Sequence, residues 1–180
     1  MDKAIITVLL IISGVVCVAF MFNAIYPAIN RGSDAVVSMA SVVDERIKSR
    51  VEIVHAVSEY DPNNGPSFWN DTNSNSSFDL FSWVKNVGTS RILGVERCDV
   101  FFGEEGDFVR VPHEDYASGV KPYWQDSLED SADEWGPNKT MKVTIVHSGS
   151  YGGSGLSTDT TYRVKLIIPN GITDEIYLSW

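Results

Sequence analysis

The stretch AIITVLLIISGVVCVAFMFNAIY, residues Ala4–Tyr26, holds no charged side chain and decides how the rest of the chain is organised. As an α-helix it is long enough to cross the hydrocarbon core of a bilayer, which is about 30 Å thick. A charged group at the membrane centre costs at least about 2.5 kcal/mol, so an uncharged run of this length is typical of an anchor. The alternative is a secretory signal peptide, but only Lys3 gives a basic flank and bulky residues such as Phe20 and Phe22 end the run. We therefore expect one transmembrane helix.

Beyond the anchor, the helical period continues, although Pro27 and Gly32 could bend or fray the helix. Apolar side chains recur at steps of three and four residues, with charged residues between them, at Val36, Ala40, Val43 and Ile47. We expect the helix to reach about Lys48. A single helix with one apolar seam needs a neighbour to cover it, which is either the chain's own domain or another copy of the chain. The sequence leaves both alternatives open.

From Arg50 onward, the period changes from helix to strand. Residues 50–60 are rich in β-branched side chains, and strand candidates follow at Phe78–Val87, Arg91–Phe102, Phe108–Val111, Thr140–His147, Thr161–Ile168 and Thr173–Trp180. About seven short strands separated by turns are typical of a sandwich. We predict a mainly β chain: an N-terminal transmembrane helix with an amphipathic extension, residues 1–48, followed by an immunoglobulin-like antiparallel β-sandwich, residues 49–180.

The charge is distributed unevenly, because all of the net charge of −10 lies beyond residue 57. Such a surface repels nucleic acid, so we exclude DNA and RNA as partners. The basic residues that flank the anchor would by simple counting place the distal domain inside the cell. Three sequons in predicted loops favour an extracytoplasmic sandwich, with candidate glycosylation sites at Asn70, Asn75 and Asn138. We expect the extracytoplasmic location.

The sequence contains almost no pattern that is typical of a catalytic or metal-binding site. The three histidines, His55, His113 and His147, are scattered, and the spacings of a nucleophile elbow or a zinc site do not occur. The Gly-rich segment 152–155 lacks the lysine of a phosphate loop and is better explained as a hairpin tip. Cys17 and Cys98 lie in the anchor and in a predicted strand, so we expect no disulfide between them. We expect no enzyme activity, no cofactor and no bound metal.

Residues 113–138 combine acidic side chains with aromatic ones, and we expect a loop there. Clustered carboxylates can hold calcium, but this spacing fits no EF-hand, so a solvated acidic loop is the better interpretation. We expect most tryptophans of the sandwich in the core or at its ends, while any exposed one would mark a contact surface. The candidate partner contacts lie in this loop and in the closing strand: Tyr123, Trp124, Trp135, Ile176, Tyr177 and Trp180.

Three segments carry a resemblance to a known family: FSWVKNVGTSRI at Phe81–Ile92, VERCDVFFGEEGDFVRVPHE at Val95–Glu114, and PNGITDEIYLSW at Pro169–Trp180. With the order of membrane helix, amphipathic extension and sandwich, the chain resembles the archaellum F and G proteins, within the archaellin-like, type IV pilin-related superfamily of archaea. The resemblance implies an exported, non-enzymatic sandwich just above the membrane that serves as a static part of the archaeal motility motor, a stator. It also implies contacts with a sibling stator protein and, through it, with the surface-layer protein.

The N-terminus departs from one pattern of that superfamily. Filament-forming members carry a short basic leader with a peptidase site before the apolar run, whereas Met1-Asp2-Lys3 offers none. We therefore expect a retained anchor and a component held at the envelope, whose helices could bundle through the apolar seam. The alternative is a minor archaellin or a pilin-like filament or adhesion subunit, since a different start codon could hide a leader.

Overall fold

The computed structural model describes residues 2–61, 63, 69–129, 133–147 and 160–179. The chain forms two compact units, Met1–Asp44 and Glu45–Trp180, and each is described by itself.

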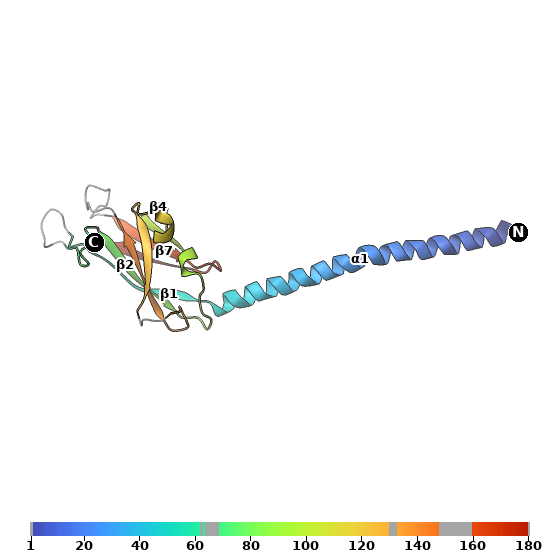
Figure 1. Cartoon of the computed structure of the whole chain (residues 1–180), viewed down its shortest axis with the longest axis horizontal. Helices are drawn as coiled ribbons and strands as arrows, with labels where there is room; N and C mark the ends of the chain where they lie inside the picture. Colours follow the sequence, from blue (N-terminus) through green and yellow to red (C-terminus); the bar gives the residue numbers. More distant parts are fainter. Residues whose placement is uncertain (1, 62, 64–68, 130–132, 148–159, 180) are drawn as a thin grey trace. The chain divides into compact units, whose positions relative to one another are not determined.

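Helix α1 spans Asp2–Lys48 without interruption and contains both Pro27 and Gly32 (Figure 1). Proline removes one backbone N–H from the helical hydrogen-bond ladder, but the apolar residues on either side of it continue the helix. The prediction of a helix to about Lys48 is confirmed. Within the described part of the chain, α1 is the one helix long and apolar enough to cross a membrane.

The second unit is a sandwich of two antiparallel four-stranded sheets, which confirms the predicted mainly β fold (Figure 1). The first sheet has the order β1-β2-β6-β5, with bounds Val51–Ser58, Asp79–Asn86, Thr140–Val146 and Tyr123–Leu128. The second has the order β4-β3-β7-β8, with bounds Asp107–Val111, Asp99–Glu104, Thr161–Ile167 and Thr173–Ser179. Strands such as β2 and β7 alternate between the interior and an outer face, as expected for sheets that are solvated on one side.

The predicted strand at Arg91–Phe102 is wrong in its first half. Ile92 forms only an isolated bridge with Trp135, and the short 3-10 helix η1, Val95–Arg97, follows. Gly94 stands before η1 in a left-handed conformation, with φ of 69°, which a β-strand does not accept. The strand therefore begins only at Asp99.

The acidic segment is also not simply a loop, because it contains the short helix α2, Glu114–Ala117, and strand β5. β5 pairs with β6 along its whole length, from Tyr123 opposite Val146 to Leu128 opposite Met141. Its acidic Asp126 obscures the alternation in the sequence, and its carboxylate lies 3.0 Å from Nε2 of His113. The acidic composition therefore concealed a strand of the sheet.

The core lies between the two sheets and is completed by large side chains from the connecting segments. Leu80, Met141 and Ile145 of the first sheet and Val100 and Leu166 of the second are fully buried. At one side of the sandwich, β1 and β8 approach each other, and the Ile53 N–H donates to Oδ2 of Asp174 at 2.6 Å. This bond lies next to the register shift between Ile53 and His55 and joins the edges of the two sheets.

Candidate functional site

The clearest structural device of the second unit is the junction at which the last turn of α1 passes into β1. A helix leaves its last carbonyl groups without helical partners. Here the carbonyl of Lys48 accepts hydrogen bonds from the backbone N–H of Thr89, at 2.8 Å, and of Ser90, at 3.3 Å. The Ser49 N–H still bonds back to the carbonyl of Glu45 at 3.0 Å, and Ser49 is buried. The end of the helix is thus capped by a turn of the sandwich.

Gly88 lets the two backbones of this junction approach closely. The N–H groups of Val87 and Gly88 both donate to the carbonyl of Arg50, at 2.9 and 3.0 Å. A Cβ atom at position 88 would lie 2.4 Å from the carbonyl oxygen of Lys48 and 2.6 Å from the amide nitrogen of Arg50. Both contacts are with backbone, which cannot rotate away, so only glycine fits there.

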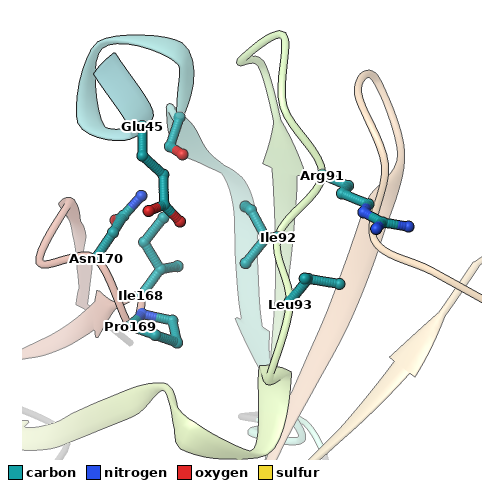
Figure 2. A pocket seen from close by; sticks show the side chains of 8 residues that line it. Glu45, Arg91, Ile92, Leu93, Ile168, Pro169 and Asn170 are labelled. Carbon is teal, nitrogen blue, oxygen red and sulfur yellow. The ribbon is translucent and has the colours of Figure 1, made fainter. Parts of the chain in front are cut away.

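A second connection joins the helix end to the turn between β7 and β8. The guanidinium Nε of Arg46 donates to the carbonyl of Asn170 at 2.9 Å. Glu45 and Asn170 line one side of a small recess of about 70 Å³, and Ile92 and Leu93 line another (Figure 2). Ligand pockets usually measure about 300–1,000 Å³, so this recess does not suit a substrate. The junction therefore serves to hold the helix end in the sandwich.

The outer face of the first sheet carries a row of aromatic side chains. The rings of His55 and Trp83 stack at a centroid distance of 5.7 Å, and Phe81 lies beside Trp83. Nζ of Lys142 lies 4.3 Å from the centre of the Phe81 ring, and the indole N–H of Trp83 donates to Glu129 at 2.8 Å. These half-buried and exposed rings give an apolar outer surface on an otherwise acidic chain.

The outer face of the second sheet centres on Arg163. Its guanidinium carbon lies 4.7 Å from the ring centre of Phe108 and 5.8 Å from that of Tyr177, and the group pairs with Glu175. Tyr177 is 50% exposed. Gly103 lies opposite both Phe108 and Arg163 in the sheet, where a Cβ atom would lie 2.7 Å from Cα of Phe108. This surface combines a cation with aromatic rings, a composition that is common where proteins bind proteins.

The structure separates the predicted contact residues into core and surface. Trp124 and Trp135 are 0% and 1% exposed, so both are core residues and the expectation that they contact a partner is corrected. Their large apolar area fills the space between the sheets, which was the alternative interpretation. Tyr123 and Ile176 are half-buried, and Ile176 packs against the core. Tyr177 remains the exposed candidate, and Trp180 lies outside the described residues.

The apolar side chains of the helix seam, Val36, Ala40, Val43 and Ile47, are all exposed in the described chain. Asn70 and Asn138 are exposed in loops, as an acceptor site requires, whereas the side-chain nitrogen of Asn75 donates to Oδ2 of Asp79 at 2.8 Å. The seam and the sequons remain predictions.

His113 is the one histidine of the described residues that is buried, and its contacts are structural. Its ring lies against Trp124 at a centroid distance of 4.5 Å, and its Nδ1 accepts from the backbone N–H of Asp115 at 3.3 Å. In the part of the chain that the structure describes, no three His, Cys, Asp or Glu side chains converge as the ligands of a metal ion. The predicted hairpin tip at residues 152–155 lies outside that part.

Two features were missed from the sequence. The turn Val87–Ser90 caps the end of the helix through contacts with residues 48–50 that no spacing in the sequence reveals. The polar loop Asp71–Asp79 is rich in Asn and Ser, and it is held together by hydrogen bonds from its own side chains. The repetition of Asp71, Asn73 and Asn75 at every second position is the signal that could have identified it.

No protein-family model matches this chain, and no curated protein matches it in sequence. Several solved structures are similar to this chain in fold. The archaellum periplasmic stator protein FlaG from Sulfolobus acidocaldarius is 23% identical, with a TM-score of 0.52 over 72% of this chain and 99% of that one. The complex of the stator proteins FlaF and FlaG from the same organism gives 23% identity and a TM-score of 0.51 over 71% of this chain and 87% of that one.

The archaeal flagellum of Methanospirillum hungatei strain JF1 is 15% identical, with a TM-score of 0.55 over 94% of this chain and 89% of that one. The fold of the chain is therefore the fold of archaellum proteins, both of a stator protein and of a filament.

Proposed function

We propose that this chain is a membrane-anchored structural component of the archaellum that acts as a stator and carries out no catalysis. The observation that carries the proposal is the likeness to FlaG, which covers 99% of that chain, together with a helix that is long and apolar enough to serve as an anchor. An archaellum component fits all three likenesses. The stator role is the more specific part of the proposal.

The physical task of a stator is to oppose the torque on a rotating filament. A membrane span alone cannot do this, because lipid is fluid and the helix would turn in it. The load must pass between the helix and the sandwich, and from the sandwich to a rigid neighbour. The junction suits this task, since the carbonyl groups of Lys48 and Arg50 are both tied to the Val87–Ser90 turn and Arg46 is tied to Asn170.

The partners that we propose are a sibling stator protein and the surface-layer protein, both outside the membrane. FlaG of S. acidocaldarius was solved in complex with FlaF, which supports a sibling partner for a chain of the same fold. The exposed Tyr177 beside Arg163 on the outer face of the second sheet is the contact surface that we favour. A planar guanidinium between aromatic rings offers both apolar area and hydrogen-bond donors.

A second candidate function is a filament subunit, which one specific observation favours. The likeness to the M. hungatei flagellum covers 94% of this chain and therefore includes much of α1 as well as the sandwich. In that case the exposed seam of the helix would pack against other copies within a filament.

Deletion of the gene in the source organism tests the proposal. We expect cells that assemble filaments which fail to rotate, or that assemble few filaments, when motility is recorded by light microscopy and filaments are counted by electron microscopy. Normal swimming of the deletion strain would rule out an archaellum role. Mass spectrometry of sheared filaments from wild-type cells separates the two candidates, since abundant chain in the filaments would identify a filament subunit.

A further inference from the structure

The loop Asp71–Asp79, whose last residue is the first of β2, has the side-chain spacing of the first nine positions of a calcium-binding loop. In such loops the first, third, fifth and ninth positions supply oxygen ligands from side chains, the seventh supplies a backbone carbonyl, and the twelfth is a bidentate glutamate, for which this chain has Ser82. Here the side chains at those four positions are Asp71, Asn73, Asn75 and Asp79, and Ser77 occupies the seventh position. All of them carry oxygen atoms of the kind that calcium prefers.

The backbone of this loop is folded around those side chains. Asp71 accepts from the N–H groups of Asn75, at 3.1 Å, and of Ser76, at 2.8 Å. The amide oxygen of Asn73 accepts from the Asn75 N–H at 3.2 Å, and that of Asn75 accepts from the Ser77 N–H at 2.7 Å. Ser76, at the sixth position, has a φ of 57°, where calcium loops usually place glycine for a sharp turn.

An independent observation points to a ligand that the protein itself does not provide. The Asp79 side chain is fully buried, and its Oδ1 has no hydrogen-bond partner among the described residues. Its other oxygen, Oδ2, accepts from the amide nitrogens of Asn73, at 2.6 Å, and Asn75, at 2.8 Å. An unsatisfied, buried carboxylate oxygen is unfavourable unless a donor or a cation meets it.

The charges around Asp79 point the same way. Glu59 is 4% exposed, and its carboxylate accepts from the N–H groups of Thr72, at 2.8 Å, and Asp79, at 3.0 Å. Among the described residues, no lysine or arginine forms an ion pair with Glu59, Asp71 or Asp79. Lys121 bonds the hydroxyl of Ser77 instead. Among the described residues, the carboxylates of Glu59, Asp71 and Asp79 therefore have no cationic partner, which favours a bound cation.

We propose that the loop Asp71–Asp79 binds a calcium ion through the side-chain oxygens of Asp71, Asn73, Asn75 and Asp79. Carboxylate and amide oxygens on an irregular loop suit Ca²⁺, which accepts six to eight oxygen ligands in flexible geometry, better than Mg²⁺, which demands a near-octahedral site. The ion supplies the partner that Oδ1 of Asp79 lacks, and the side-chain amides of Asn73 and Asn75 turn their oxygens toward it. Because Asn75 is then a ligand, it carries no glycan, whereas Asn70 and Asn138 remain free to do so.

Calorimetric titration of the full chain in detergent micelles, after removal of metals with EDTA, tests the proposal. We expect one Ca²⁺ per chain, with a dissociation constant of about 10⁻⁴–10⁻³ M as in extracellular calcium modules, and weaker binding of Mg²⁺. The variant Asp79→Asn should lose this binding. The matched control Asp107→Asn, which removes one exposed carboxylate in the other sheet, should keep it. Equal binding by both variants, or no binding by the wild type, would overturn the proposal.

A second measurement keeps the test decisive if Asp79→Asn does not fold. Terbium can replace calcium and emits light when tryptophan excites it, so Tb³⁺ emission from the full chain reports an occupied site near Trp69, which stands two residues before Asp71. We expect added Ca²⁺ to quench this emission and Asn73→Ala to weaken Tb³⁺ binding at least about tenfold, as expected when a ligand is lost. Ser74→Gly, which changes a side chain that is not a proposed ligand, should bind normally. Emission that is unchanged in Asn73→Ala would contradict the site.

Discussion

At the scale of single residues, Gly88 is the position on which the helix junction depends most. A methyl group at this position would lie 2.4 Å from the carbonyl oxygen of Lys48, so the turn or the helix end must shift. We expect Gly88→Ala to lower the free energy of unfolding by about 1–3 kcal/mol. Thermal unfolding of the full chain in detergent, followed by circular dichroism, should show a fall in Tm of several degrees.

Gly136→Ala is the matched control, because a Cβ atom there meets no atom within 4 Å. It should unfold at the wild-type temperature or slightly above it, since alanine has fewer unfolded conformations than glycine. Equal destabilisation by the two substitutions would show that the close approach at the junction is not what requires glycine.

Cys98 is a buried thiol whose chemistry follows from its position. Burial raises its pKa to about 12 from an ordinary value of 9.0, and the charges of Asp126, Glu96 and Asp99 add to this. The folded state therefore holds the proton more tightly than the unfolded state. This contribution to stability is fully present below pH 9 and is lost as the pH rises toward 12.

We expect the thiolate fraction of Cys98 at pH 8 to be roughly a thousandfold smaller in the folded chain than in the unfolded one. In a Cys17→Ser background, which leaves a single thiol, iodoacetamide should therefore modify Cys98 only after denaturant is added. Rapid modification of the folded chain would contradict the burial of this residue.

At this scale, the sequence predicts the size and chemistry of a side chain better than its exposure. The tryptophans of the sandwich could be assigned to the core by size, but which of them remains exposed depends on three-dimensional packing, so Trp124 and Trp135 were wrong as contact candidates. Asp79 shows a second limit of the sequence. Its acidic neighbours are visible in the sequence, whereas the orphaned oxygen that makes it informative appears only in the fold.

At the scale of elements, the contact between β1 and β8 joins the two sheets at one edge. The Asp174 carboxylate accepts from the Ile53 N–H, which the neighbouring register shift leaves available. We expect Asp174→Ala to leave this N–H without a partner and to cost about 1–2 kcal/mol of stability. Urea unfolding of the full chain measures the loss, and Thr173→Ala, an exposed neighbour, is the control. A midpoint unchanged by Asp174→Ala would show that the edge bond contributes nothing.

The seam of α1 gives a second prediction at this scale. If the seam joins copies of the chain, glutamine at both Val36 and Val43 should lower the mass measured by sedimentation in detergent, because polar side chains disrupt an apolar helix contact. Ser38→Gln, on the opposite side of the helix by its spacing, should leave the mass unchanged. A monomeric wild-type chain would favour the alternative, in which the seam packs on the chain's own domain.

Among the elements, the long helix and most strands could be predicted because their apolar period is strong. In β6 and β7 apolar residues recur at every second position of the sequence, and the observed bounds are close to the predicted ones. β5 could not be found, because the residue that breaks its alternation, Asp126, is satisfied by His113 from the segment before α2. Such a partner becomes visible only when the chain has folded.

At the scale of the whole molecule, the sequence predicts a tethered sandwich and the structure confirms a sandwich preceded by a helix suited to span a membrane. The likeness to both FlaG and a flagellar filament means that fold alone does not choose between a stator and a filament subunit. The difference lies in what the sandwich touches in the cell. A stator must hold a fixed neighbour, whereas a filament subunit holds copies of itself.

Crosslinking of intact cells with an amine-reactive reagent, followed by mass spectrometry, tests this central claim most directly. We expect Lys165, on the same outer face as Tyr177 and Arg163, to crosslink to a sibling stator protein or to the surface-layer protein. Crosslinks from this face mainly to filament subunits or to cytosolic proteins would contradict the account.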